Sequence, residues 1–168
     1  MLTKVSDIKN IVKDGIASPK DVFAKIKQLA ADPDWKVREV AATALVEISK
    51  KRQNEVISEM LQWAADKDPN IRRSASEGLR DVARKNPEII LPVLEKLKTD
   101  EDLYVKKSVA NVLRNATRKS PIIVIDTCKK WAVLKNANTN WIIKDGLKKA
   151  KQSNPSEVAK ILDSLLNN

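Results

Sequence analysis

One pattern of apolar and polar positions recurs along the chain at intervals of 34 residues. It is clearest within residues 66–121, where Asp68 and Leu79 are repeated as Asp102 and Leu113. The same register extends to both sides of this segment. Two helices per unit at such a period are typical of an α-solenoid, in which stacked repeats share one core because none can bury its apolar face alone. The sequence therefore predicts an all-α fold, a solenoid of about five helix pairs.

Each repeat carries two signals for the start of a helix. Ser-Pro or Asn-Pro precedes the first helix of a pair, because the side-chain oxygen can cap free amides and proline suits the first turn. Aspartate precedes the second helix, at Asp34, Asp68 and Asp102, where its charge also suits the helix dipole. No such pair occurs near position 53, where we expect Asn54 to cap the helix. The predicted helices are 3–14, 19–31, 36–51, 54–65, 69–85, 87–98, 103–119, 121–133, 138–152 and 155–166.

Glycine and proline positions refine these helices. Gly15 is expected to end the first helix, and Pro92 is expected to kink the helix that contains it. Gly78 and Gly146 occupy equivalent places inside second helices, with Ala44 in the corresponding earlier position. A glycine inside a helix costs about 1 kcal/mol relative to alanine. We therefore expect a neighbouring helix to pack closely at both glycines.

The second helix of each repeat has one apolar face and one polar face. Second helices usually line the concave surface of an α-solenoid, so the polar positions of successive repeats are expected to share one groove. These positions are Glu39, Thr43, Arg73, Glu77, Lys107, Asn111, Arg114, Trp141, Asp145 and Lys148.

The net charge of +10 is concentrated in residues 103–151, which hold 12 Lys or Arg and only two acids, Asp126 and Asp145. The rest of the chain carries equal numbers of cations and anions. A positive field confined to one part of the chain attracts a polyanion, although surface lysines can also serve solubility alone. We therefore expect a nucleic acid as partner, with solubility as the alternative.

The composition excludes several kinds of chemistry. The chain has no histidine, which removes the commonest general base and the commonest metal ligand. Its single cysteine, Cys128, can form neither an internal disulfide nor a thiolate cluster. No apolar segment approaches the roughly 18 residues needed to cross a membrane, and the N-terminus lacks the apolar core of a signal peptide. We expect a cytoplasmic protein that forms a single domain of residues 1–168.

Some of the charged and aromatic positions have more than one interpretation. Glu77 lies between two arginines, one of them Arg73, so it can belong to an ordinary surface ion-pair network or be a carboxylate kept ionised to face a cation. Trp141 lies among lysines, where an exposed indole can stack on a base, but it can equally pack in the core. Sequence spacing leaves both alternatives open. Trp63 and Trp131 share one place in their repeats, and we expect both in the core.

Four segments give the chain a specific resemblance to a known family. They are EVAATAL, QWAADKDPNIRRSASEGLR, YVKKSVANVLRNATRKSP and NWIIKDGLKK. Between residues 39 and 148 the chain resembles the HEAT-like repeats of bacterial DNA alkylation-repair glycosylases, the AlkC and AlkD group, and is more similar to AlkC. The resemblance implies binding of alkylated duplex DNA and removal of cationic methylated bases, such as 3-methyladenine or 3-methylcytosine, by cleavage of the N-glycosidic bond. It implies no metal and no cofactor.

The resemblance also assigns roles to residues of the predicted groove. Glu39 and Glu77 match acidic positions, where a carboxylate would stabilise positive charge on the sugar in the transition state. Arg73 matches an arginine that contacts DNA, and Asn111 is the asparagine of SVAN. Asn115 departs from the AlkC pattern, which has aspartate there. The expected nucleic-acid-binding residues are Arg73, Lys107, Asn111, Arg114, Asn115, Trp141 and Lys148.

A further row of basic residues has a structural interpretation. Arg38, Arg72 and Lys106 stand where HEAT repeats commonly carry arginine in a ladder with aspartate between repeats. The sequence thus predicts a DNA-binding HEAT-like protein of the alkylation-repair type and leaves its glycosylase activity open. The alternative is a non-catalytic scaffold that binds an acidic protein or RNA through the basic C-terminal half. The oligomeric state also stays open, with a monomer as the expectation.

Overall fold

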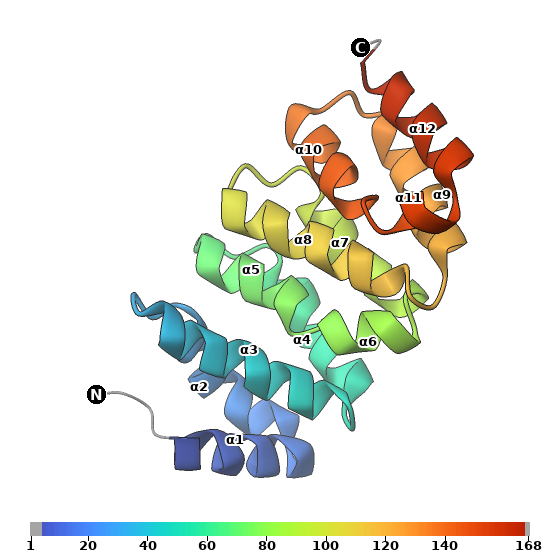
Figure 1. Cartoon of the computed structure of the whole chain (residues 1–168). Helices are drawn as coiled ribbons and strands as arrows, with labels where there is room; N and C mark the ends of the chain where they lie inside the picture. The colour runs from blue at the N-terminus through green and yellow to red at the C-terminus, as the bar shows by residue number, and fades with distance from the viewer. Residues whose placement is uncertain (1–4, 167–168) are drawn as a thin grey trace.

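The computed structural model describes residues 5–166, and its secondary structure in that range is entirely helical (Figure 1). This confirms the predicted all-α fold. The helices are α1 (Val5–Ala17), α2 (Pro19–Ala30), α3 (Trp35–Ser49), α4 (Gln53–Trp63), α5 (Pro69–Glu77), α6 (Arg80–Lys85), the 3-10 helix η1 (Glu88–Ile90), α7 (Leu91–Leu97), α8 (Leu103–Ala116), α9 (Pro121–Ala132), α10 (Ala137–Gly146), α11 (Ala150–Ser153) and α12 (Pro155–Ser164).

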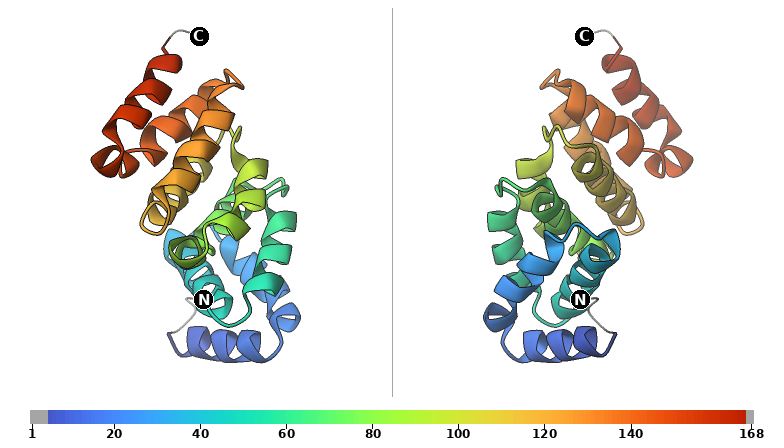
Figure 2. Two further views of the ribbon diagram at one scale, coloured as in Figure 1. Left: turned by 90° about the vertical axis from the view of Figure 1, so that its right-hand side faces the viewer. Right: turned by 90° about the vertical axis from the view of Figure 1, so that its left-hand side faces the viewer.

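The helices form two layers that run the length of an elongated stack (Figures 1 and 2). One layer contains α3, α5, α8 and α10, each in contact with the next, and the other contains α2, α4, α7 and α9. Residues 5–166 thus hold four complete helix pairs, with α1 at one end and α12 at the other. The predicted solenoid is confirmed. We call the solvent side of α3, α5, α8 and α10 the second-helix face.

Acidic or amide side chains cap all four second helices of the described stack. Asp34, Asp68 and Asp102 each accept a hydrogen bond from the backbone amide two residues ahead, at 2.8–2.9 Å. Asn136 does the same for α10 and also accepts from the amide of Thr139. These bonds satisfy amides that have no partner within the helix, so they fix where each second helix begins. The three predicted aspartate caps are confirmed.

The caps of the first helices differ from the prediction. The Ser120 hydroxyl accepts from the amide of Ile123, whereas Ser18 and Asn154 make no capping bond with their side chains. Asn54 does not cap α4, which begins one residue earlier with Arg52 at the cap position. The guanidinium of Arg52 instead donates to carbonyls at the end of α1, which ties the start of α4 to α1.

Two second helices end at a glycine instead of continuing. α5 stops just before Gly78, and α10 stops at Gly146. A Cβ on Gly78 would lie 2.8 Å from the Cβ of Leu45, and one on Gly146 would lie 2.8 Å from Cδ1 of Leu113. The predicted close packing is therefore confirmed at both positions. The prediction of unbroken helices over 69–85 and 138–152 is wrong, because a weak helix former at a tight contact lets the helix end there.

Gly15 and Pro92 also act differently from the prediction. Gly15 lies inside α1, where a Cβ would come within 2.3 Å of Cδ1 of Ile48, so it provides a close contact between α1 and α3 and does not end the helix. Pro92 lies in the first turn of α7, where a missing amide hydrogen costs nothing. The predicted helix over 87–98 is therefore divided into η1 and α7 before the proline.

A single apolar cluster runs through the stack from Ile11 to Leu165. Trp63 and Trp131 are both buried in it, as predicted, and the indole Nε1 of Trp131 donates to a carboxylate oxygen of Glu95 at 2.6 Å. Cys128 is buried as well, and burial raises the pKa of its thiol to about 12. Within residues 5–166 no helix is long and apolar enough to cross a membrane.

Candidate nucleic-acid interface

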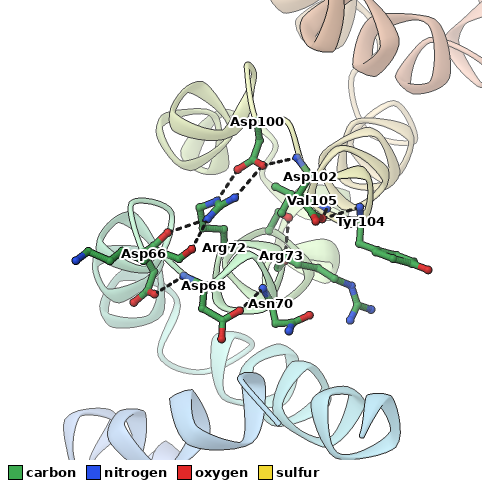
Figure 3. A network of polar contacts seen from close by, with 11 residues as sticks. Asp66, Asp68, Asn70, Arg72, Arg73, Asp100, Asp102, Tyr104 and Val105 are labelled. Atoms are coloured by element: carbon green, nitrogen blue, oxygen red, sulfur yellow. Dashed lines mark hydrogen bonds and ion pairs between the residues drawn. The ribbon is translucent and has the colours of Figure 1, made fainter. Parts of the chain in front are cut away.

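Arg72 ties the second repeat to the third (Figure 3). Its Nε and Nη2 donate to the two carboxylate oxygens of Asp100, at 2.6 and 3.1 Å, and its Nη1 donates to the carbonyls of Asp66 and Lys67. The side chain of Asp100 is only 7% exposed, and its Oδ1 also accepts from the amide of Asp102. The Asp100 carboxylate, with further nearby acids, raises the pKa of Arg72 despite partial burial. The predicted ladder between repeats is present here.

The other two positions of this ladder use different partners. Lys106 donates from Nζ to Oδ1 of Asn138 at 2.9 Å. Arg38 donates from Nη1 to the carbonyls of Asp32 and Pro33, as Arg72 does one repeat later, but its buried Nε has no hydrogen-bond partner among residues 5–166. The Asp66 carboxylate pairs with Lys27 instead, at 2.7 Å. The hydrogen bond from Lys27 and a second from the backbone lower the pKa of Asp66.

A hollow of about 400 Å³ opens on the N-terminal half of the second-helix face. Its walls include the aromatic residues Trp35 and Tyr104, which are 59% and 63% exposed. Between them Nη2 of Arg73 donates to Oε1 of Glu39 at 2.6 Å. Tyr104 projects from the start of α8 beyond Arg73 (Figure 3). Three successive repeats therefore contribute to one hollow with aromatic, cationic and anionic walls, which also include Arg38 and Asn70.

Both candidate catalytic carboxylates form ion pairs with arginines. Glu39 pairs with Arg73 of the next repeat, while Glu77 pairs with Arg80 at 3.4 Å within its own repeat. Glu77 lies at the end of α5, outside the residues that line the hollow. The structure thus brings Glu39 and Arg73 together directly and places Glu77 one turn beyond Arg73.

A cluster of charges occupies the C-terminal half of the second-helix face. Arg114 donates from Nη1 to the Asp145 carboxylate and to its carbonyl oxygen, and Lys148 donates to the same carboxylate at 2.6 Å. Burial favours the neutral form of Asp145, but the hydrogen bonds from Lys148 and Arg114 outweigh it and lower the pKa of the carboxyl group. Trp141, Lys144, Asp145 and Lys148 line a second hollow of about 200 Å³.

Two lysines of α8 lie against aromatic rings. The Nζ atom of Lys107 is 5.4 Å from the centroid of the Tyr104 ring, and that of Lys106 is 5.8 Å from the Trp141 ring. Both distances fit cation–π contacts. Trp141 is half-buried and packs one side against the core, which agrees with the core-packing interpretation, whereas stacking on a base stays a prediction.

The two asparagines of the SVAN segment differ in exposure. Asn111 is half-buried on α8, on the same face as Lys107. Asn115 is only 8% exposed, and its amide oxygen accepts a hydrogen bond from Nε of Arg84 at 3.1 Å. Asn115 therefore has little surface available for direct contact with a ligand.

Sequence reasoning did not single out Trp35 or Tyr104 as members of a site. Both lie within two residues of a capping aspartate, Asp34 or Asp102, at the start of a second helix. Both residues lie in the first turn of their helix, and both are exposed to solvent. An aromatic residue one or two places after the cap is the signal that would have found them. Tyr104, for example, stands where the other repeats have Lys36, Asn70 and Asn138.

Among the described residues, no group of His, Cys, Asp and Glu side chains is arranged to hold a metal ion. The site therefore consists of arginines, lysines, paired carboxylates and exposed aromatic rings. Such a set can bind phosphates and stack on planar groups.

Residues 23–114, more than half of the chain, match the HEAT repeats family. The protein therefore belongs to the HEAT-repeat proteins. A comparison with curated proteins finds no match.

The solved structures that are similar to this chain include members of the AlkC and AlkD group. The DNA-bound alkylpurine DNA glycosylase AlkC from Pseudomonas fluorescens, whose DNA contains an abasic site analog, superposes with a TM-score of 0.77 and 26% identity over 92% of this chain. AlkD2 from Streptococcus mutans gives a TM-score of 0.71 at 26% identity, covering 87% of this chain and 75% of its own. A third structure, smu.31 from Streptococcus mutans UA159, gives 0.68 at 29% identity, covering 79% and 69%. The resemblance found in the sequence is confirmed, including the greater similarity to AlkC.

This chain spans only 44% of the length of the AlkC chain.

Proposed function

We propose that this protein binds duplex DNA along the second-helix face and excises cationic alkylated bases at the hollow between Trp35 and Tyr104. The observation that carries the proposal is the Glu39–Arg73 pair held between two exposed aromatic rings, on the same face as the lysines of α8 and α10. The similarity to a DNA-bound AlkC supports it.

Each part of this face would have a separate task in binding. Lysines and arginines of α8 and α10 would neutralise backbone phosphates, which makes the affinity strongly dependent on salt. Exposed Trp35 and Tyr104 provide flat surfaces on which a base or a sugar can stack. Arg73 can exchange its bond to Glu39 for a bond to a phosphate, because an ion pair near the surface contributes little free energy.

The proposed reaction requires charge stabilisation more than acid catalysis. In a cationic alkylated base, the glycosidic bond breaks with both electrons moving to the base, which leaves as a neutral molecule. The sugar then carries the positive charge until water adds to C1′ and loses a proton. Glu39, which lines the hollow, would be freed from Arg73 to stabilise that charge on the sugar and accept the proton. Glu77, one turn beyond Arg73 and outside the hollow lining, would stabilise the same charge from a greater distance.

The test is base release from alkylated duplex DNA by the purified protein. We expect Glu77→Gln and Glu39→Gln each to lower the rate by roughly a hundredfold, the scale of losing one preorganised electrostatic group. Glu77→Gln should leave DNA affinity nearly unchanged. Glu47→Gln is the matched control, because Glu47 lies on the same helix as Glu39 but lines a hollow beside α1. Equal rates for the wild type and both variants would remove these carboxylates from the mechanism.

A substitution at Asn115 tests for a gain of activity. Asn115→Asp would place a carboxylate beside Nε of Arg84, which would keep it ionised, and restore the anion of the AlkC pattern. We expect base release to increase. No release by any of these proteins would refute the catalytic part of the proposal.

A second candidate function is binding without catalysis, as a scaffold for RNA or an acidic protein. It is favoured by the ion pairs that already occupy Glu39 and Glu77, and by the burial of Asn115. The triple variant of Lys107, Arg114 and Lys148 to alanine separates the partners. If DNA is the ligand, the fall of log K with log salt becomes shallower by up to about 2.7, at about 0.9 per lost phosphate contact. An unchanged slope would favour a different partner.

A further inference from the structure

Asp145 has an unusual position among the basic second helices. It is the only acid in α8 and α10, and Arg114 is the only arginine in these two helices. The structure places the two together across the repeat boundary, and Lys148 donates to the other carboxylate oxygen. The Asp145 side chain is 18% exposed, whereas that of Lys148 is 70% exposed. One carboxylate thus holds two cations at the surface where the chain is most basic.

The two oxygens of the Asp145 carboxylate accept hydrogen bonds from Arg114 and Lys148, as two oxygens of a phosphate can. A guanidinium and an ammonium group bind carboxylates and phosphates with the same atoms and similar geometry. The hollow beside Asp145, lined by Trp141, Lys144 and Lys148, has a volume of about 200 Å³, enough for a phosphate group. Lys144 is exposed and has no ion-pair partner within the described part of the chain, so it can serve as a third cation.

We propose that Asp145 is an internal counter-anion that occupies a phosphate subsite formed by Arg114 and Lys148. The proposal rests on the proposed binding of DNA and specifies how this half of the face takes part in it. A backbone phosphate enters by displacing the carboxylate from its two cations. Asp145 thereby lowers the affinity of the basic end of the stack for any polyanion, so non-specific binding there is weaker.

The exchange is physically accessible. Arg114 and Lys148 are held by a partly exposed ion pair, and such pairs contribute little net free energy in water. Lys148 has room to follow an incoming phosphate, because most of its side chain lies in solvent. The displaced carboxylate remains charged next to the phosphate, and this repulsion is the cost that reduces affinity.

The test compares Asp145→Asn with Asp126→Asn, two variants with the same change in net charge. Asp126 is exposed on α9, in the layer opposite the second-helix face, so its loss frees no cation there. We expect Asp145→Asn to bind duplex DNA about fivefold more tightly at low salt, the scale of removing one unit charge about 4 Å from a phosphate in water. The fall of log K with log salt should steepen by up to about 0.9, because Arg114 and Lys148 together neutralise one phosphate at this subsite.

The control should change affinity by less than about twofold, since its charge is distant from the site. Asp145→Ser removes the same charge with a smaller side chain and should act in the same direction. Circular dichroism of each variant checks that the stack stays folded. Affinity of Asp145→Asn equal to or below that of Asp126→Asn would overturn the inference.

A second measurement separates this inference from the proposed function. Titration with inorganic pyrophosphate, followed by the NMR signal of the Trp141 indole, probes the subsite without DNA. We expect Asp145→Asn to reach half-saturation at a severalfold lower pyrophosphate concentration than the wild type. If no protein binds DNA but this difference is found, the proposed function fails and the subsite stands. If DNA binds while the two titrations coincide, the subsite is refuted and the proposed function stands.

Discussion

The ladder between repeats contains two equivalent arginines that differ in one contact, so one serves as a control for the other. Arg72 and Arg38 occupy equivalent positions and donate to equivalent pairs of backbone carbonyls. Only Arg72 also forms a two-bond ion pair with a carboxylate, that of Asp100. We predict that Arg72→Ala destabilises the protein considerably more than Arg38→Ala does, and that the difference measures the ion pair between repeats.

The magnitudes follow from burial. Arg38→Ala removes hydrogen bonds to two carbonyls, for an expected loss of about 1 kcal/mol. Arg72→Ala also leaves the carboxylate of Asp100, which is 7% exposed, with only the amide of Asp102 as partner. Breaking a fully buried pair costs about 3–5 kcal/mol. Because Arg72 is partly exposed, we expect a total loss of about 2–3 kcal/mol, or a fall in Tm of about 4–12 °C for a chain of this size.

Urea unfolding followed by circular dichroism measures both losses, provided that the m-value is unchanged. A double-mutant cycle with Asp100→Asn isolates the coupling between Arg72 and Asp100, which should be at least about 1 kcal/mol. Losses for the two arginine variants that agree within about 0.5 kcal/mol, or a coupling near zero, would refute the reasoning. The stack would then be held together by its apolar core and not by the ladder.

Two further predictions concern packing and pH. Gly78→Ala should destabilise the protein by about 1–3 kcal/mol in urea unfolding, because its Cβ would lie 2.8 Å from the Cβ of Leu45, which cannot rotate away; a stabilised variant would contradict this. Burial favours the neutral form of Glu95, yet the bonds from Lys98 and Trp131 lower its pKa below 4.5. Its bonds therefore contribute stability above about pH 4.5 that is lost as pH falls through the lowered pKa. The difference in unfolding free energy between the wild type and Glu95→Gln should shrink from pH 6 to pH 3, and a constant difference would contradict it.

The repeat period predicted the fold because each of its signals has a local physical cause. Asp34, Asp68 and Asp102 cap their helices through bonds to amides two residues ahead, and such short-range contacts can be read from the sequence. The tryptophans at equivalent places were predicted to be buried because the repeat gives them the same neighbours. The ends of α5 and α10 depend on a helix from another repeat, so the period alone did not predict them.

The candidate site was less predictable, because it depends on which of several possible partners each charged side chain pairs with. Helical spacing placed Glu77 beside Arg73, but Arg73 turns to Glu39 of the preceding repeat. Both partners are compatible with the sequence, and the choice depends on the distance between stacked helices. The exposure of Trp35 and Tyr104 likewise follows from how far adjacent helices overlap, which a sequence period does not specify.

The second helices that are interrupted at a glycine alternate with continuous ones along the stack, so the structure repeats fully only after two helix pairs. Three features recur at 68 residues, twice the repeat length. They are Gly78 and Gly146, the leucines Leu45 and Leu113 on which they pack, and the buried Trp63 and Trp131. A solenoid lengthened by 68 residues would set each broken helix against an unbroken one. Lengthening by 34 would set a glycine against Leu79, which lies between α5 and α6 and outside both helices. The modular unit for extending this protein is therefore two helix pairs.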